Sequence, residues 1–216
     1  MADNASQAYP ARLSVAYPDG PRDRLSVLVR ILLAIPILII GALVTGSSQT
    51  GQADPGWDFG RTEALVGAIG LFLATALMIL FRQKYPRWWF DWNLEVARFT
   101  TRINAFVLLL RDDYPSTDER QAVTVDIDYP DAKNDLNRVL PLFKWFLAIP
   151  HYIVLSVLGT VSVVVVVLGW FAVLITGKLP TWIFQYLEGL MRWGLRVAAY
   201  AFLLTTDRYP PFRLGE

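Results

Sequence analysis

The sequence predicts an all-α polytopic membrane protein formed by tandem duplication of one unit. Each unit would contain a strand, a two-helix membrane hairpin and an amphipathic interfacial helix, and the strands would form a small cytoplasmic β pairing. Three observations indicate this class: an apolar fraction of 54%, a mean hydropathy of +0.37, and motifs that recur in the same order in both halves. A soluble fold does not tolerate so much apolar surface, so lipid is the better solvent.

Composition also limits the possible functions. The formal net charge of +1 does not indicate a nucleic-acid partner, and the chain has no cysteine and one histidine. Thiol chemistry, disulfides and ordinary zinc or haem sites are therefore excluded or nearly so, and we expect no cofactor. The sequence shows no phosphate loop or nucleophile elbow, so we do not expect an enzyme. Residues 1–9 are polar, and we expect a disordered start there rather than a cleavable secretory signal.

An internal repeat organises the chain. Tyr17-Pro18-Asp19 returns as Tyr129-Pro130-Asp131, and Ala34-Ile35-Pro36 returns as Ala148-Ile149-Pro150. The basic, aromatic and proline matches are Arg24, Arg30, Pro86, Trp88, Phe90, Arg98 and Arg102 against Arg138, Lys144, Pro180, Trp182, Phe184, Arg192 and Arg196. The sequence therefore predicts a first membrane repeat over residues 10–118 and a second over residues 119–216.

Each repeat opens with a predicted strand, over Arg12–Tyr17 and Ala122–Tyr129. In the second strand, apolar residues alternate with Thr124, Asp126 and Asp128, which is the two-residue period of a half-buried strand. A single strand leaves its backbone groups unpaired. We therefore expect the two strands to pair with each other on one side of the membrane.

The first repeat contains two tracts of spanning length. Leu25–Thr45 and Glu63–Phe81 are each close to the ~20 residues that a hydrocarbon core requires. The polar stretch over residues 46–60 between them is typical of a loop. Pro36 should kink the first helix, and Pro150 should kink its counterpart, because proline removes a backbone donor.

The second repeat contains one long apolar tract, Leu136–Thr176, which exceeds the length of a single span. We interpret it as a tight helical hairpin whose turn would use Ser156, Gly159 and Thr160. The alternative interpretation is an interfacial helix followed by one long span after Pro150, which would change the topology.

Basic residues predict the orientation. Arg22 and Arg24 precede the first tract and Arg82 and Lys84 follow the second, whereas the loop over residues 46–60 carries only acidic charge. Because short basic segments stay in the cytoplasm, both termini are predicted to lie there, in a bacterial inner membrane. The two repeats would then be related in parallel.

Two further helices, Pro86–Leu110 and Pro180–Leu204, are predicted to lie flat among the lipid headgroups. In the first, Glu95, Arg98 and Arg102 recur on one face, opposite an apolar stripe. Spanning would cost about 2.5 to 3.5 kcal/mol per charge, against about 0.3 to 0.6 kcal/mol gained per large apolar residue. The aromatic residues expected in the interfacial belt are Trp88, Trp89, Trp92, Trp182 and Trp193.

The ends of the two repeats share a pattern of aromatic residues, two arginines, paired leucines and Tyr-Pro. The matching stretches are RWWFDWNLEVARFTTRINAFVLLLRDDYP and WIFQYLEGLMRWGLRVAAYAFLLTTDRYPPF. On these residues the chain resembles the bacterial membrane proteins of domain-of-unknown-function family 4389, in two tandem copies. The resemblance covers most of the chain and supplies no activity or catalytic residue. The first copy departs from the closing Tyr-Pro-Pro-Phe pattern at Tyr114-Pro115-Ser116-Thr117, so its end is expected to serve as a connector.

Basic residues near the expected interface are candidate contacts for anionic lipid headgroups. They are Arg30, Arg98, Arg102, Lys144, Arg192 and Arg196. For Arg30 and Lys144 the alternative interpretation is snorkelling of the side chain to the headgroups.

Two other features have structural interpretations. Ala64, Gly67, Gly70 and Ala74 form a small-residue stripe, which predicts close helix packing within the protein or with a partner. His151 has Ile37 as its counterpart in the first repeat. A structural role is therefore favoured over a repeated metal or proton site.

Together these features favour a non-enzymatic inner-membrane accessory or scaffold protein. Its expected partners are the lipid bilayer with anionic lipids, and a membrane protein complex or a second copy of itself. The alternative function is a small oligomeric channel or transporter. Sparse polar residues within the spans count against that alternative.

Overall fold

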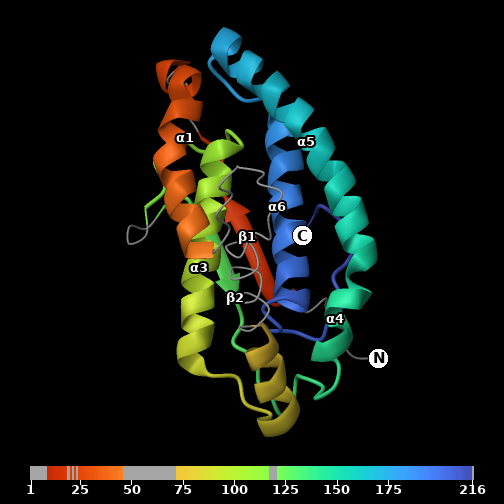
Figure 1. The fold of residues 1–216 in the computed structure, drawn as a ribbon. Coiled ribbons are helices and arrows are strands. Elements are labelled where there is room, and N and C mark those ends of the chain that lie inside the picture. The colour runs from red at the N-terminus through yellow and green to blue at the C-terminus, as the bar shows by residue number, and fades with distance from the viewer. Residues whose placement is uncertain are drawn as a thin grey trace, which may run out of the picture.

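The computed structural model describes residues 9–18, 20, 22, 24–45, 72–116 and 121–215. In chain order, its elements are β1 (Ala11–Val15), α1 (Arg24–Thr45), a helix over Phe72–Arg82, α3 (Arg87–Val107), β2 (Val123–Ile127), α4 (Pro141–Leu147), α5 (Ile149–Thr176) and α6 (Thr181–Ala201). The described chain is mostly helical, with one small sheet (Figure 1). The expected disordered start, except Tyr9, and the expected loop over residues 46–60 lie outside the described residues.

The two predicted strands pair with each other, as expected. β1 and β2 are antiparallel, and Leu13 lies opposite Val125 at the centre of the register. In both strands, buried and exposed side chains alternate, so one face of the sheet joins the core and the other is open. Arg12, Ser14 and Asp126 occupy the open face. The pairing was expected because a single strand leaves its backbone groups unpaired, and the alternation predicted which face of each strand is buried.

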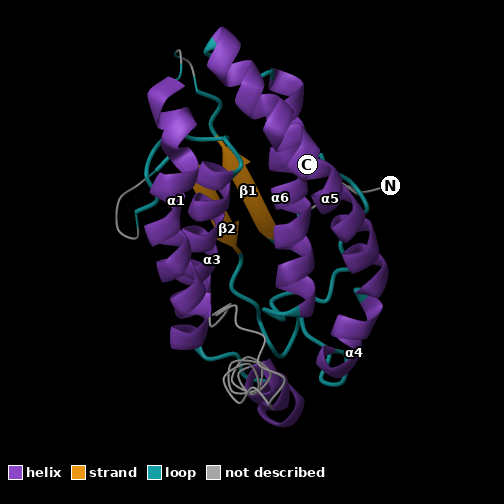
Figure 2. Cartoon of the chain, turned by 45° about the horizontal axis from the view of Figure 1, so that its top comes forward, coloured by secondary structure: helices purple, strands orange, loops and turns teal. Residues whose placement is uncertain are grey.

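Strands and helices are exchanged between the two halves of the chain. β1, from the first half, packs against α6, and β2, from the second half, packs against α3. α1 then packs on α3, and α5 packs on α6. Figures 1 and 2 show the sheet between α3 and α6, with α1 and α5 on the outer sides. Because of this exchange, neither predicted repeat is a separate packing unit.

The predicted hairpin in the second repeat is wrong. α5 runs without a break from Ile149 to Thr176, and the shorter α4 precedes it. The hydroxyl groups of the residues that were expected to form a turn donate hydrogen bonds inside the helix. Ser156 Oγ donates to the carbonyl of Ile153 at 2.8 Å, and Thr160 Oγ1 donates to that of Ser156 at 2.9 Å. Such bonds to the preceding turn let Ser and Thr remain in a helix.

The two prolines behave differently. Pro36 lies inside α1, where a kink was expected, whereas Pro150 is in the first turn of α5. A proline is tolerated in the first turn because the missing N–H would have no partner there. The chain therefore changes helix at Ala148 instead of kinking at Pro150.

Matching left-handed residues follow the helices of both halves. Gly177 (φ 74°) ends α5, and Gln83 (φ 44°) follows the helix over Phe72–Arg82. Their N–H groups donate to the carbonyls of Val173 and Ile79, at 2.8 and 3.1 Å. Leu109 and Leu204, after α3 and α6, have φ of 63° and 57°. Left-handed leucine is strained, so its occurrence at corresponding points indicates that both helix ends are held by tertiary contacts.

Among the described residues, α5 alone is long and apolar enough to cross a membrane. Its most apolar window has a mean hydropathy of 2.6. One face of α5, including Val165, Gly169 and Val173, is buried, and most of the rest is exposed. The spanning role of α1 and of the segment ending at Phe81 stays a prediction.

The small-residue stripe cannot be placed. Ala64, Gly67 and Gly70 lie outside the described residues, and Ala74 is exposed. Close glycine packing does occur elsewhere. A Cβ atom at Gly169 would lie 2.9 Å from a Leu179 methyl group, and one at Gly189 would lie 2.9 Å from the Leu214 carbonyl oxygen.

Candidate functional site

Two corresponding arginines bind the outer edges of the sheet. Arg98 of α3 donates from Nε to the Val125 carbonyl at 3.1 Å, and Arg192 of α6 donates from Nε to the Leu13 carbonyl at 3.1 Å. The two acceptors are partners in the strand register. An unpaired strand edge is a template for further pairing, and these arginines occupy it on both sides.

Each edge arginine is itself held by an acid one turn earlier in its helix. Arg98 pairs with Glu95 at 2.6 Å, and Arg192 pairs with Glu188 at 2.9 Å. Glu188 also accepts the Val15 backbone N–H at 3.0 Å, so it caps the β1 edge as well. The polar faces of α3 and α6 were expected to be open to water. Instead, their central arginines and Glu188 contact the strands.

The tyrosine that follows each strand also contacts the other half of the chain. Tyr17 donates its hydroxyl to the Leu179 carbonyl at 2.6 Å, and Tyr129 donates to the Tyr85 carbonyl. The Tyr17 ring meets Phe184 edge to face at 5.0 Å, and the Tyr129 ring meets Phe90 in the same way at 5.1 Å. Each strand is therefore anchored to a helix from the other half at several points.

A basic residue of α1 and one of α4 each pair with an aspartate that follows α3 or α6. Arg30 bonds to Asp112, and Lys144 bonds to Asp207 at 2.6 Å. Arg30 also lies over the Phe106 ring at 4.7 Å. In the same arrangement, Lys144 lies 5.3 Å from the centre of the Tyr200 ring. Burial lowers the pKa of Lys144, and the hydrogen bond that its ammonium donates to Asp207 opposes this shift without cancelling it.

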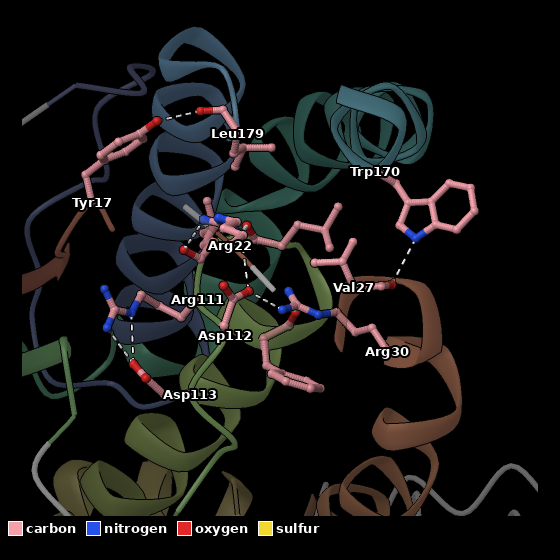
Figure 3. A network of polar contacts seen from close by, with 12 residues as sticks. Tyr17, Arg22, Val27, Arg30, Arg111, Asp112, Asp113, Trp170 and Leu179 are labelled. Carbon is pink, nitrogen blue, oxygen red and sulfur yellow. Dashed lines mark hydrogen bonds and ion pairs between the residues drawn. The ribbon is translucent and has the colours of Figure 1, made fainter. Parts of the chain in front are cut away.

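Figure 3 shows the cluster around Asp112. Arg22 and Arg30 both point toward this carboxylate, and Arg22 lies 3.5 Å from it. Arg22 also donates to the carbonyls of Leu109 and Leu110. Burial lowers the pKa of Arg22, and the charge of Asp112 opposes that shift. This cluster ties the start of α1 to the end of α3.

The remaining basic candidates bind the segments that follow α3 and α6. Arg102 donates to the Ser116 carbonyl at 2.6 Å, and Arg196 donates to the Gly215 carbonyl at 2.9 Å. All six predicted lipid contacts therefore hold acceptors within the protein. They occur as three pairs of corresponding residues, one member in each half of the chain, and the structure does not gather the six into one open basic pocket.

Sequence reasoning missed the aspartates that hold two of these residues. A signal was present, because Asp112 and Asp207 lie at corresponding distances from the Tyr-Pro motifs that close the repeats. However, Arg30 comes close to Asp112 only because α1 packs against α3, and the sequence does not predict that packing.

The predicted aromatic belt is only partly at the surface. Trp88, Trp92 and Trp182 are exposed, and Trp89 is half-buried and stacked on Trp92 at 5.3 Å. Trp193 is buried at 4% exposure, so its predicted interfacial position is wrong. The reason is that α5 covers the apolar face of α6 on which Trp193 lies.

His151 is enclosed by aromatic rings. Its Nδ1 accepts the Trp193 indole N–H at 3.2 Å, and its ring stacks on Phe212 with centroids 3.9 Å apart. Its counterpart Ile37 forms a small apolar cluster with Phe99 and Ile103. Within the described ranges, no three His, Cys, Asp or Glu side chains lie together as a metal site would require.

A basic hollow lies where the helix over Phe72–Arg82 leads into α3. It has a volume of about 850 Å³ and is lined by residues 78, 82–88 and 129–133. Four of its lining residues are basic, and Asp131 is its single acid. The carboxylate of Asp131 accepts the Lys133 backbone N–H at 3.0 Å and the Asn134 amide at 2.6 Å. These hydrogen bonds lower the pKa of Asp131, and the bond from the Lys133 backbone N–H has the largest effect.

Comparison with known proteins gives a match to one family model, over part of the chain. Residues 140–213 match the model described as a domain of unknown function (DUF4389). The match takes in α4, α5, α6 and the closing tail, and it corresponds to a single copy. No curated protein and no solved structure matches the chain.

Proposed function

We propose that the protein is a non-enzymatic accessory or scaffold protein attached to the bacterial inner membrane. The observation that carries this proposal is the exposed apolar surface of α5 and α1. Its larger members are Ile153, Val157, Val163, Val164, Leu168, Phe171 and Ile175 on α5, and Leu28, Leu32, Leu33, Leu38, Ile39 and Ile40 on α1. An apolar surface of this extent marks a membrane or a partner, because water does not tolerate it on a monomer.

The opposite character of the sheet supports the same proposal. Its open face carries Arg12, Asp126 and Asp128, and Arg12 pairs with Asp128 at 2.8 Å with both side chains more than half exposed. Such charges remain in water. The molecule therefore has both apolar surface suited to lipid and charged surface suited to an aqueous phase.

The packing of α5 constrains how the chain meets the bilayer. α5 and α6 lie side by side and antiparallel (Figures 1 and 2). They touch at His151 and Trp193, again where Tyr186 bonds to the Leu158 carbonyl at 2.8 Å, and again at Gly169. Both helices therefore share one orientation relative to the membrane.

We infer an orientation along the membrane surface for this pair. If α6 crossed the bilayer, Arg192 and the Leu13 carbonyl that it binds would lie near mid-membrane. The exposed Arg12, Asp126 and Asp128 of the same sheet would also enter the hydrocarbon. Burying each of these charges there would cost about 2.5 to 3.5 kcal/mol. In the surface orientation, α5 sits in the acyl region of one leaflet and the sheet remains in water. Multi-pass insertion, expected from the sequence, is the competing arrangement.

The surface orientation keeps both termini on the cytoplasmic side, as the basic segments predict. It also gives the proposed duplication a simple geometry, with a twofold axis along the membrane normal. Support for the duplication comes from the corresponding pairs Arg98 with Val125 and Arg192 with Leu13, and from the matched left-handed residues after both pairs of helices.

Label depth tests the orientation directly. The chain has no cysteine, so nitroxides can be placed one at a time at Ile153, Val164 and Ile175, all exposed on α5. In bilayers, accessibility to oxygen and to a polar nickel chelate should give the three sites similar depths. A central site much deeper than both ends would show a crossing helix. Polar accessibility at all three would overturn membrane attachment.

The scaffold role and the transport alternative need separate measurements. After gentle solubilisation, a scaffold should be recovered from native membranes in a stoichiometric complex that photo-crosslinks through exposed α1 or α5 positions. Flux through proteoliposomes that contain the purified protein alone would favour the channel or transporter instead.

A further inference from the structure

The basic hollow beside the start of α3 is a site of a different kind from the six predicted lipid contacts. Its basic residues Arg82, Lys84, Arg87 and Lys133 face one acid, Asp131, so the lining carries an excess of three positive charges (four minus one). Like charges that lie close together repel one another, and a bound anion would relieve that repulsion.

Three of the four basic side chains of this hollow make no polar bond elsewhere in the described chain. Within the described part of the chain, Arg82, Lys84 and Lys133 have no side-chain hydrogen bond or ion pair. Arg87 lies over the Tyr129 ring at 4.7 Å and is 3.7 Å from the exposed Asp91. In contrast, the arginines at the strand edges are held by carbonyls and acids inside the protein.

Backbone dipoles add to the same positive potential. Pro86, Arg87 and Trp88 line the hollow and form the start of α3, and no side chain caps that helix. The N-terminus of a helix of 21 residues presents free N–H groups and a partial positive charge to an anion.

The second repeat shows that the fold does not require this charge. The positions corresponding to Arg82, Lys84 and Arg87 are Thr176, Lys178 and Thr181. They occupy the equivalent helix end and helix start with one basic residue in place of three.

We infer that this hollow binds a phosphate-type oxyanion, and that the phosphodiester headgroup of an anionic membrane lipid is its source. The volume of about 850 Å³ suits a phosphoglycerol headgroup with room for the start of its acyl chains. Trp88, which lines the site and is 71% exposed, offers apolar surface on which acyl chains can rest. The lipid source rests on the proposed membrane attachment, whereas the oxyanion site does not.

Paired charge variants test the site on the full chain. Lys84→Gln with Lys133→Gln removes two charges from the hollow. The matched control, Lys178→Gln with Arg213→Gln, removes two exposed charges elsewhere. Thermal stability of both purified variants should equal that of the parent, and Arg82→Gln alone provides a milder variant if it does not.

Binding is measured with two probes. Native mass spectrometry in a neutral detergent follows phosphatidylglycerol against phosphatidylcholine, and calorimetry follows inorganic phosphate. We expect the parent and the control to prefer phosphatidylglycerol, and the hollow variant to bind it roughly tenfold more weakly or worse. If only inorganic phosphate shows this loss, the oxyanion site stands and the lipid source is wrong. Equal phosphatidylglycerol and phosphate binding by all variants would overturn the inference, whatever the label depths of α5 show.

Discussion

Arg192 in the middle of α6 donates its Nε hydrogen to the carbonyl oxygen of Leu13 in the middle of β1, at 3.1 Å. The pair joins residues 179 positions apart and brings the first strand of the chain against its last helix. Its counterpart, Arg98 with Val125, has the same length. Together, these two bonds fix how the halves of the chain exchange their strands.

Replacing the edge arginines should destabilise the protein unequally. A hydrogen bond from a charged group contributes about 1.5 to 3 kcal/mol, and less when the group is open to water. The Arg192 side chain is 12% exposed and that of Arg98 is 32% exposed. Arg192→Gln should therefore lower the free energy of unfolding by about 2 kcal/mol and Arg98→Gln by about 1 kcal/mol.

Denaturant unfolding in mild detergent measures both losses. The control is Arg12→Gln on the same sheet, whose ion pair is largely exposed and should contribute about 0 to 1 kcal/mol. Equal effects of all three variants would show that the strand edges do not depend on these arginines.

The buried ion pair between Lys144 and Asp207 predicts that the effect of replacing one partner depends on whether the other is present. Asp207→Asn leaves a fully buried ammonium without its carboxylate, which typically costs about 3 to 5 kcal/mol. Adding Lys144→Met should recover much of that loss, since the charge is gone. The ion pair of Arg111 with the exposed Asp113 supplies the control, and Asp113→Asn should change thermal stability little. If the double variant is no better than Asp207→Asn alone, the pair is not coupled.

Two glycines in α6 should respond to alanine in opposite directions. A Cβ at Gly189 would meet the Leu214 backbone at 2.9 Å, so Gly189→Ala should cost about 1 to 3 kcal/mol. Gly194 has open space around the added atom, so Gly194→Ala should stabilise the helix by about 0.5 to 1 kcal/mol. Melting temperatures of the two variants decide this, and a shared sign would contradict the docking of the C-terminal tail on α6.

The continuity of α5 can be measured as a distance. Ile153 and Ile175 are both exposed and lie 22 residues apart (175 minus 153), which is about 33 Å along one helix. Spin labels at these positions in the cysteine-free chain should give that separation by pulsed dipolar spectroscopy. A hairpin that turned near Gly159 would bring the labels much closer together.

Alkaline pH should destabilise the protein through Tyr85. Burial, reinforced by the charge of Tyr129, raises the pKa of Tyr85, whose hydroxyl donates to the Leu203 carbonyl at 2.7 Å. The unfolded chain releases this proton above pH ~10, where the folded chain still keeps it. Stability from this group is therefore complete below pH ~10 and is lost as pH rises further.

Unfolding measured from pH 9 upward should show this loss in the parent and a smaller loss in Tyr85→Phe. Tyr114→Phe, at an exposed position, controls for removal of a hydroxyl. An identical alkaline slope in the parent and Tyr85→Phe would rule out Tyr85 as the source.

Local patterns were enough to predict several elements. The alternation around Val125 predicted a strand with one buried face, and the helical periodicity around Arg98 predicted α3. The turn expected at Ser156, Gly159 and Thr160 was wrong because their local signal is ambiguous. Ser and Thr can end a helix, or they can bond back to the preceding turn, and the surrounding apolar residues favoured the continuous helix.

Residue order alone predicts the periodic elements, and it also shows the large apolar fraction and the recurrence of basic, aromatic and proline positions. The folded chain was needed to show that β1 joins α6, that Asp112 and Asp207 hold Arg30 and Lys144, and that Trp193 is buried. The physical reason is that periodicity records which face of an element is apolar, whereas the partner of that face depends on chain segments far away in sequence.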